Sequence, residues 1–195
     1  MITMNNIEKM RLFVALPVPE DLAGWLENVQ NSLKKMGVMA SWTRMETLHL
    51  TLKFMGDTPV EILDSIIKAV QETGAANKPF KIRASKVGVF FYGKKARVIW
   101  AGVESEKELL QELYRDLESY LLKAGISRSK KRFLPHLTLA RPKGRGGGRE
   151  LLELLNQFEN HRSENFECHS IDLYQSVLKP SGAVHTLVSR AFMKQ

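Results

Sequence analysis

The sequence His-Leu-Thr-Leu occurs twice in this chain, beginning at His49 and at His136. The chain holds five histidines, and chance would place a second such word after another of them roughly a few times in a thousand. A pair of imidazoles can supply one neutral base and one protonated acid near neutral pH. Threonine hydroxyls can donate hydrogen bonds to phosphate oxygens as charge develops. The two words therefore indicate proton transfer at phosphorus, provided that the fold brings them together.

Each word has the two-residue period of a β-strand, which sends alternate side chains to opposite faces. The apolar set around the first word, expected to pack against helices, is Leu48, Leu50, Leu52 and Phe54. The polar set, expected to line a cleft, is Thr47, His49, Thr51 and Lys53.

The elements around the two words also repeat. Apolar runs and helical stripes predict strand, helix, histidine strand, helix and strand, twice in succession. An offset of 87 residues aligns Leu12 with Ile99, Leu22 with Leu109, Leu26 with Leu113 and His49 with His136. Related halves tend to pack about an approximate twofold axis. We therefore expect a duplicated, bilobal α+β fold with two mostly antiparallel sheets, helices on the outside and a central cleft.

The duplication also predicts how the chain is organised. We expect residues 1–9 to form a poorly ordered N-terminal extension and residues 10–195 to form one domain. Its sequence halves would be approximately 10–95 and 96–195.

Composition limits the class of protein. With 44% hydrophobic and 26% charged residues, the chain has the composition of a globular protein. Its longest apolar runs are far shorter than the roughly 18 residues that span a bilayer, so no membrane segment is expected. The single Cys168 cannot form an internal disulfide and the N-terminus lacks a secretory signal, so we expect a cytoplasmic protein. We also expect a monomer, although the sequence itself leaves the oligomeric state open. A net charge of +8 favours a polyanionic partner such as RNA.

At these residues the chain resembles the 2H phosphoesterase superfamily, in which each lobe of a duplicated α+β fold carries one His-x-Thr motif. The closer similarity is to the RNA 2′,3′-cyclic phosphodiesterases. The segments that carry it are MRLFVALPVPE, SWTRMETLHLTLKFMGD, RVIWAGV, RFLPHLTLARP and IDLYQSVLKPSGAVH. The resemblance implies hydrolysis of a terminal 2′,3′-cyclic phosphate, on RNA or on a nucleotide, to a 2′-phosphomonoester. It also implies that neither a metal nor a cofactor takes part.

The resemblance further implies a role for each residue of the two words. His49 would donate a proton to the leaving 3′ oxygen and His136 would accept one from water, while Thr51 and Thr138 would bind phosphate oxygens. The nearly symmetric sequence itself gives no reason to prefer either histidine for either role. Arg141 matches the end of the second motif and is a candidate phosphate ligand. Strict alternation nevertheless places it on the leucine face, so either the strand bulges there or Arg141 is structural.

Other interpretations stay open. Within the superfamily, the rivals are a 2′-5′ RNA ligase and an ADP-ribose cyclic phosphate hydrolase. From another class, the rival is a non-catalytic RNA-binding module. His161, His169 and His185 are expected to be structural, and the histidines and the cysteine show no zinc-ligand spacing. Residues 144–149, a Gly-Arg segment, are predicted to form a flexible surface loop rather than an RNA-binding element.

Overall fold

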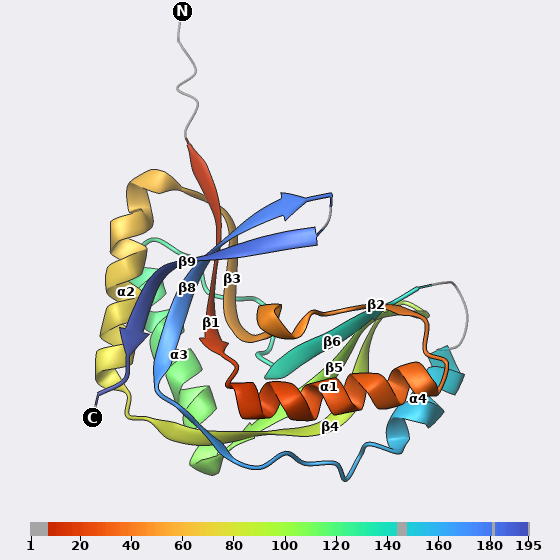
Figure 1. Ribbon diagram of the computed structural model, residues 1–195. Helices are drawn as coiled ribbons and strands as arrows, with labels where there is room; N and C mark the ends of the chain where they lie inside the picture. Colours follow the sequence, from red (N-terminus) through yellow and green to blue (C-terminus); the bar gives the residue numbers. More distant parts are fainter. Residues whose placement is uncertain (1–7, 144–147, 181, 195) are drawn as a thin grey trace, which may run out of the picture.

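The structure, a computed structural model, describes residues 8–143, 148–180 and 182–194 (Figure 1). Residues 1–7 of the expected extension and residues 144–147 of the expected loop lie outside these ranges, and Lys9 already belongs to the first strand. The strands are β1 (Lys9–Pro17), β2 (Ala40–Trp42), β3 (His49–Pro59), β4 (Phe80–Tyr92), β5 (Lys95–Ser105), β6 (His136–Pro142), β7 (Phe166–Cys168), β8 (Ser170–Lys179) and β9 (Gly182–Phe192). The α-helices are α1 (Glu20–Lys35), α2 (Leu63–Ala76), α3 (Leu109–Lys123) and α4 (Gly148–Asn156). Short 3-10 helices are η1 (Met45–Thr47), η2 (Val60–Ile62) and η3 (Glu106–Glu108).

The strands form two lobes that meet at the two histidine strands. The order is β7-β4-β5-β6-β3-β1-β8-β9, with β2 paired to β6, and the pairing is antiparallel. One lobe is β3-β1-β8-β9 and the other is β6-β5-β4-β7, and they join where Leu50 of β3 pairs with Leu137 of β6. This arrangement confirms the expected bilobal α+β fold, although the two sheets are continuous through that one pair.

The two halves of the sequence exchange strands. β4 belongs to the first half but pairs with β5, and β8 belongs to the second half but pairs with β1. Each lobe is therefore built from both halves of the chain, so neither half can complete a lobe alone.

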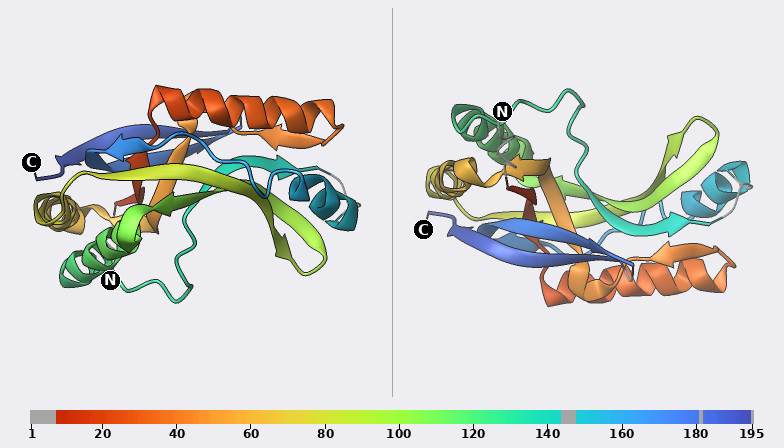
Figure 2. Two further views of the ribbon diagram at one scale, coloured as in Figure 1. Left: turned by 90° about the horizontal axis from the view of Figure 1, so that it is seen from below. Right: turned by 90° about the horizontal axis from the view of Figure 1, so that it is seen from above.

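Two amphipathic helices lie on opposite sides of the molecule (Figure 2). The buried apolar positions of α1 are Leu22, Leu26, Val29 and Leu33, and those of α3 are Leu110, Leu113, Leu117 and Leu121. These positions recur every three or four residues, so each helix presents one apolar face to the core. Among the described residues, no helix combines the length and apolar composition that crossing a bilayer requires.

The 87-residue offset holds for the histidine strands but not for β1 and β5. Ala15 pairs with Thr51 and Trp100 pairs with Thr138, so β1 and β5 correspond at an offset of 85 residues. The predicted match of Leu12 with Ile99 is therefore wrong by two residues, because the pairing register of a strand cannot be read from its apolar pattern alone.

An extra residue interrupts the pairing of β3. Two consecutive residues of β1 pair with Thr51 and Lys53, which leaves Leu52 as a β-bulge. A bulge reverses the alternation of side chains beyond it. Leu52 and Lys53 are both buried as a result, whereas Phe54 is 52% exposed. The prediction that Lys53 lines the cleft and Phe54 packs in the core is wrong for this reason.

β6 has the same irregularity at the corresponding position. Consecutive residues of β5 pair with Thr138 and Ala140, so Leu139 is the extra residue. Leu139 and Ala140 are both buried, and Arg141 is exposed on the opposite side. The two histidine words are thus followed by matching bulges.

A buried polar side chain from the other half of the sequence contacts each bulge. Lys53 Nζ lies 2.7 Å from Oε1 of Glu118 in α3 and donates a second hydrogen bond to the carbonyl oxygen of Ser127. In the other lobe, the amide of Gln30 in α1 donates a hydrogen bond of 2.9 Å to the carbonyl oxygen of Leu139. Both Gln30 and Glu118 are buried, so these contacts hold the bulges from inside the core.

We predict that Glu118→Gln lowers the free energy of unfolding by about 3–5 kcal/mol, because Lys53 is then buried without its charged partner. Urea unfolding at pH 7 measures this loss. Burial alone would raise the pKa of Glu118, but the hydrogen bonds from Lys53 and Ser129 outweigh it, so the pKa lies below its usual value of 4.5. Stability from a lowered carboxyl pKa is present above the unfolded-state pKa and lost as pH falls through the folded-state value. The difference from wild type should therefore shrink at acid pH.

Glu153→Gln is the matched control, because the Glu153 side chain is 66% exposed in its pair with Arg149. We expect a change within about 0.5 kcal/mol for this surface pair. A Glu118→Gln loss no larger than that of the control would contradict the prediction.

Candidate active site

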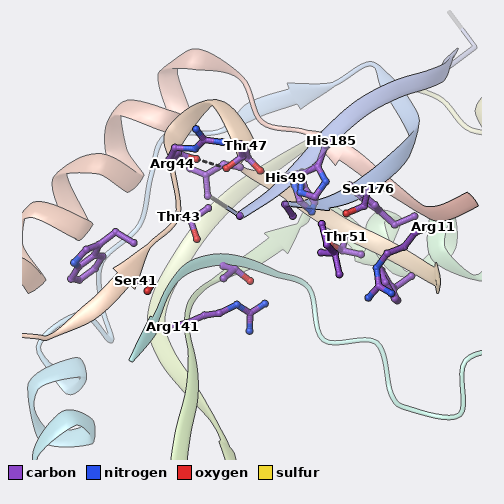
Figure 3. Close-up of a pocket in the computed structure, with 18 of the residues that line it drawn as sticks. Arg11, Ser41, Thr43, Arg44, Thr47, His49, Thr51, Arg141, Ser176 and His185 are labelled. Carbon is purple, nitrogen blue, oxygen red and sulfur yellow. Dashed lines mark hydrogen bonds between the residues drawn. The ribbon is translucent and has the colours of Figure 1, made fainter. Parts of the chain in front are cut away.

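A cleft of about 750 Å³ lies where the two lobes meet (Figure 3). Its walls come from β1, β3, β6, the β8–β9 hairpin and the segment that joins β2 to β3. The five site residues predicted from the sequence all line it: His49, Thr51, His136, Thr138 and Arg141. The structure therefore brings the two words together in one cavity.

The arrangement of the four histidine and threonine side chains follows from the strand pair that joins the lobes. That pair lies in the middle of the two words. Extending its antiparallel register by one residue on either side sets each histidine opposite the threonine of the other word. The approximate twofold axis passes through this pair, so the two imidazoles enter the cleft from related directions.

Both imidazoles are oriented in the same way by the backbone. His49 Nδ1 lies 2.8 Å from the carbonyl oxygen of Thr47, and His136 Nδ1 lies 2.7 Å from the carbonyl oxygen of Leu134. A carbonyl oxygen can only accept, so each Nδ1 carries the proton that it donates. In the neutral ring, Nε2 is then the free basic nitrogen. Each histidine can therefore exchange a proton with a ligand through Nε2.

The environment of His49 disfavours its protonated form. Burial lowers the pKa of His49 below its usual value of 6.5, and the neighbouring His185 and His136 lower it further. The hydrogen bond to the carbonyl oxygen of Thr47 acts in the opposite direction without reversing the shift. The free protein therefore favours the neutral form of His49. A bound anion would raise its pKa again, since an opposite charge nearby favours the charged form.

The bulge at Leu139 decides where Arg141 points. The carbonyl oxygen of Leu139 accepts hydrogen bonds from the backbone N–H of Thr43 and the side-chain amide of Gln30. Beyond this bulge the strand turns the side chain of Arg141 toward the cleft (Figure 3). The sequence left two possibilities, a bulged strand or a structural role for Arg141, and the structure has the bulged strand.

Several cleft residues were not found by sequence reasoning. Arg11 lies with its guanidinium carbon 4.7 Å from the ring centroid of Phe54, and Arg44 lines the opposite end (Figure 3). His185, expected to be structural, also lines the cleft, with its ring centroid 5.3 Å from that of His49. His161 and His169 are not among the lining residues. Arg11, Arg44 and His185 all lie in segments that carry the family resemblance, and that resemblance was the signal that could have singled them out.

The charge of the cleft fits an anionic ligand. Its charged lining residues, among those that the structure describes, are the arginines Arg11, Arg44 and Arg141. No aspartate or glutamate within the described ranges lines it, although Arg11 and Arg44 pair with the nearby carboxylates of Asp57 and Glu46. Those ranges also contain no group of three or more His, Cys, Asp or Glu side chains placed to hold a metal ion.

Comparison with known proteins identifies the family. The model described as LigT like Phosphoesterase matches residues 16–100 and, again, residues 102–185, so each matched segment contains one histidine word. RNA 2′,3′-cyclic phosphodiesterase of Methanothermobacter thermautotrophicus is 33% identical over 91% of this chain and 96% of its own length. The protein of that name from Archaeoglobus fulgidus is also 33% identical, over 90% and 96%. The chain belongs to the LigT-like phosphoesterase family of the 2H superfamily.

Solved structures share the fold. The crystal structure of TT0787 of Thermus thermophilus matches with a TM-score of 0.77 and 26% identity, covering 94% of this chain and 98% of that one. Escherichia coli LigT complexed with 3′-AMP matches with a TM-score of 0.74 and 19% identity, covering 96% and 99%. The bilobal arrangement is therefore the arrangement of this family.

We predict that His49 titrates below pH 6.5 in the free protein and that inorganic phosphate moves its midpoint upward. Burial disfavours the imidazolium ion, and a bound anion compensates for that cost. NMR titration of the imidazole Cε1–H resonances, assigned with His49→Ala, measures both midpoints. A free-protein midpoint at or above 6.5, or one that phosphate leaves unchanged, would contradict this account of the site.

Proposed function

We propose that this protein hydrolyses the 2′,3′-cyclic phosphate at the end of RNA, or of a nucleotide, to a 2′-phosphomonoester. The observation that carries the proposal is the pair of imidazoles, each with Nδ1 tied to a backbone carbonyl, that line one cleft together with two threonines and Arg141. Relatives that are one-third identical over nearly their whole length bear the name RNA 2′,3′-cyclic phosphodiesterase, which supports the same activity.

The proposed reaction is a single displacement at phosphorus. Nε2 of His136 accepts a proton from water as the water oxygen attacks the phosphorus atom. The bond from phosphorus to the 3′ oxygen breaks, and His49 donates its proton to that oxygen, which leaves the phosphate on the 2′ oxygen. The assignment of donor and acceptor follows the family resemblance, because the two words themselves are nearly equivalent.

The remaining residues would stabilise the charge on the phosphate. The hydroxyls of Thr51 and Thr138 would donate hydrogen bonds to its non-bridging oxygens, and the guanidinium of Arg141 would pair with it. The substrate also supplies what the free enzyme lacks. Since the empty cleft lowers the pKa of His49, the anionic phosphate would favour its protonated form before donation. On this mechanism, the proton donor is prepared by the substrate itself.

We predict that His49→Ala and His136→Ala each lower kcat for a nucleoside 2′,3′-cyclic phosphate by about 10²- to 10⁴-fold, the usual contribution of a general acid or base. Assays in excess EDTA, with the product identified by phosphorus NMR, measure the loss. The wild type should retain its activity in EDTA and release the 2′-monoester, because imidazoles perform both proton transfers. The control is His169→Ala, since the side chain of His169 is 62% exposed and does not line the cleft. Full turnover by either cleft variant, with native circular dichroism, would exclude the mechanism.

We also predict that Arg141→Ala lowers kcat/KM by about 10- to 100-fold, because a hydrogen bond to a charged phosphate is lost. Arg141→Lys should recover part of this, since it keeps the charge but not the planar fork of donors. Steady-state kinetics measure both variants. Arg149→Ala is the matched control, as that side chain is 93% exposed on α4. Equal effects of Arg141→Ala and Arg149→Ala would mean that Arg141 does not bind the phosphate.

A further inference from the structure

A second cavity adjoins the cleft beside His49. It measures about 250 Å³, and six of its nine lining residues also line the cleft. The three residues that belong to it alone are Glu46, Tyr174 and Val184. The side cavity therefore borders the cleft at His49 and His185, within reach of a ligand whose phosphate lies in the cleft.

The walls of the side cavity are aromatic. The rings of Phe13 and Tyr174 are stacked, with centroids 5.2 Å apart and planes inclined by 18°. The ring of His185 meets Phe13 edge-on at 4.9 Å and also meets His49 edge-on at 5.3 Å. The hydroxyl of Tyr174 donates to the buried carboxylate of Asp172, which fixes the ring. Phe13 is itself buried and supports the other rings, so Tyr174 is the ring on which a nucleobase can stack.

His185 is also part of this wall. Its Nδ1 is buried and has no hydrogen-bond partner among the residues that the structure describes. Buried polar groups are normally satisfied. This nitrogen is enclosed by protein rather than exposed to the cavity, as is Nε1 of Trp100 in the other lobe, so it does not by itself mark a contact with a ligand.

The mouth of the side cavity carries one positive and one negative side chain. Arg44 Nε lies 3.5 Å from Glu46 Oε1, and both side chains are mainly exposed. The pair holds a guanidinium and a carboxylate next to each other, and each keeps further donors or acceptors free. Guanine presents acceptors at O6 and N7 and donors at N1 and N2. Among the four RNA bases, its edge is the fullest match for an arginine and a glutamate together.

The lobe of His136 has a cavity of its own, which borders the cleft at fewer residues. It measures about 380 Å³ and is lined by Phe90, Trp100 and Glu104 among others, but it shares only His136 with the cleft. Glu104 pairs with Arg83, with Nη2 at 2.9 Å from Oε2, a shorter distance than the 3.5 Å between Arg44 and Glu46. This cavity is the natural comparison for an experiment.

We propose that the side cavity beside His49 binds the nucleobase of the terminal nucleotide and that Arg44 and Glu46 make guanine the preferred base. The inference rests on the proposed function, which places the leaving 3′ oxygen, and hence the ribose and its base, on the His49 side of the phosphate. Stacking on the ring of Tyr174 would hold the plane of the base, and the ring of His185, which is steeply inclined to that plane, would contact its edge. Glu46 would accept from N1 and N2, and Arg44 would donate to O6.

The test compares the 2′,3′-cyclic phosphates of guanosine and uridine, with glycerol 1,2-cyclic phosphate as a substrate that has no base. We expect wild type to favour guanosine over uridine in kcat/KM, and Glu46→Gln to lower that preference by about tenfold. Glu46 is exposed, so this isosteric change does not threaten folding. Val184→Trp, which fills the side cavity from a residue that does not line the cleft, should raise KM for both nucleotides. Trp100→Phe in the other cavity should leave the preference for guanosine as it is.

The outcomes separate the two proposals. If wild type turns over neither the nucleotides nor glycerol 1,2-cyclic phosphate, the proposed function fails. If wild type is active but shows no preference for guanosine, or if Glu46→Gln keeps that preference in full, the base site is wrong while the function stands. A preference that Trp100→Phe alters and Glu46→Gln does not would place the base beside His136 instead.

Discussion

The cleft depends on the extra residue at the end of each histidine word and on the buried polar side chain that holds it. The bulges at Leu52 and Leu139 end the strict alternation directly after the two words. Glu118 reaches the first bulge through Lys53, and Gln30 reaches the second through the carbonyl oxygen of Leu139. Each contact comes from a helix of the opposite half of the sequence. Burying these polar groups is tolerable only because each is hydrogen-bonded. The shape of the site and the stability of the core therefore depend on the same hydrogen bonds.

The matching bulges orient different side chains in the two lobes. After the bulge of β3, Phe54 is turned outward with Arg11 above its ring, and after the bulge of β6, Arg141 occupies the equivalent position. The imidazoles, in contrast, keep identical contacts to the backbone. Duplication has thus preserved the geometry of proton exchange while the surrounding side chains diverged. The different side chains at positions 54 and 141 make the two sides of the cleft unequal, whereas the two His-Leu-Thr-Leu words are identical.

Much of this could be predicted from the sequence, and the rest fails for definite physical reasons. The repeated word, its two-residue period and the repeated elements predicted the lobes and brought His49 and His136 to one cleft. Lys53 and Phe54 were placed on the wrong faces because a bulge leaves no mark in an apolar pattern. Arg11, Arg44 and His185 join the site through strand pairing and loop geometry, which depend on contacts between distant residues. Local periodicity carries no information about those contacts.

Because β4 and β8 each pair with a strand of the other half, the two halves of the chain must stay together for the site to form. A chain with only one half of this sequence would have a histidine word but would lack a strand of its lobe, so two such chains would have to associate, and dilution would separate them. Here the tight β4–β5 turn at Gly93 and Lys94 joins the halves covalently. Short linkers give effective concentrations on the order of millimolar. The pairing of the two imidazoles is therefore intramolecular and independent of how dilute the protein becomes.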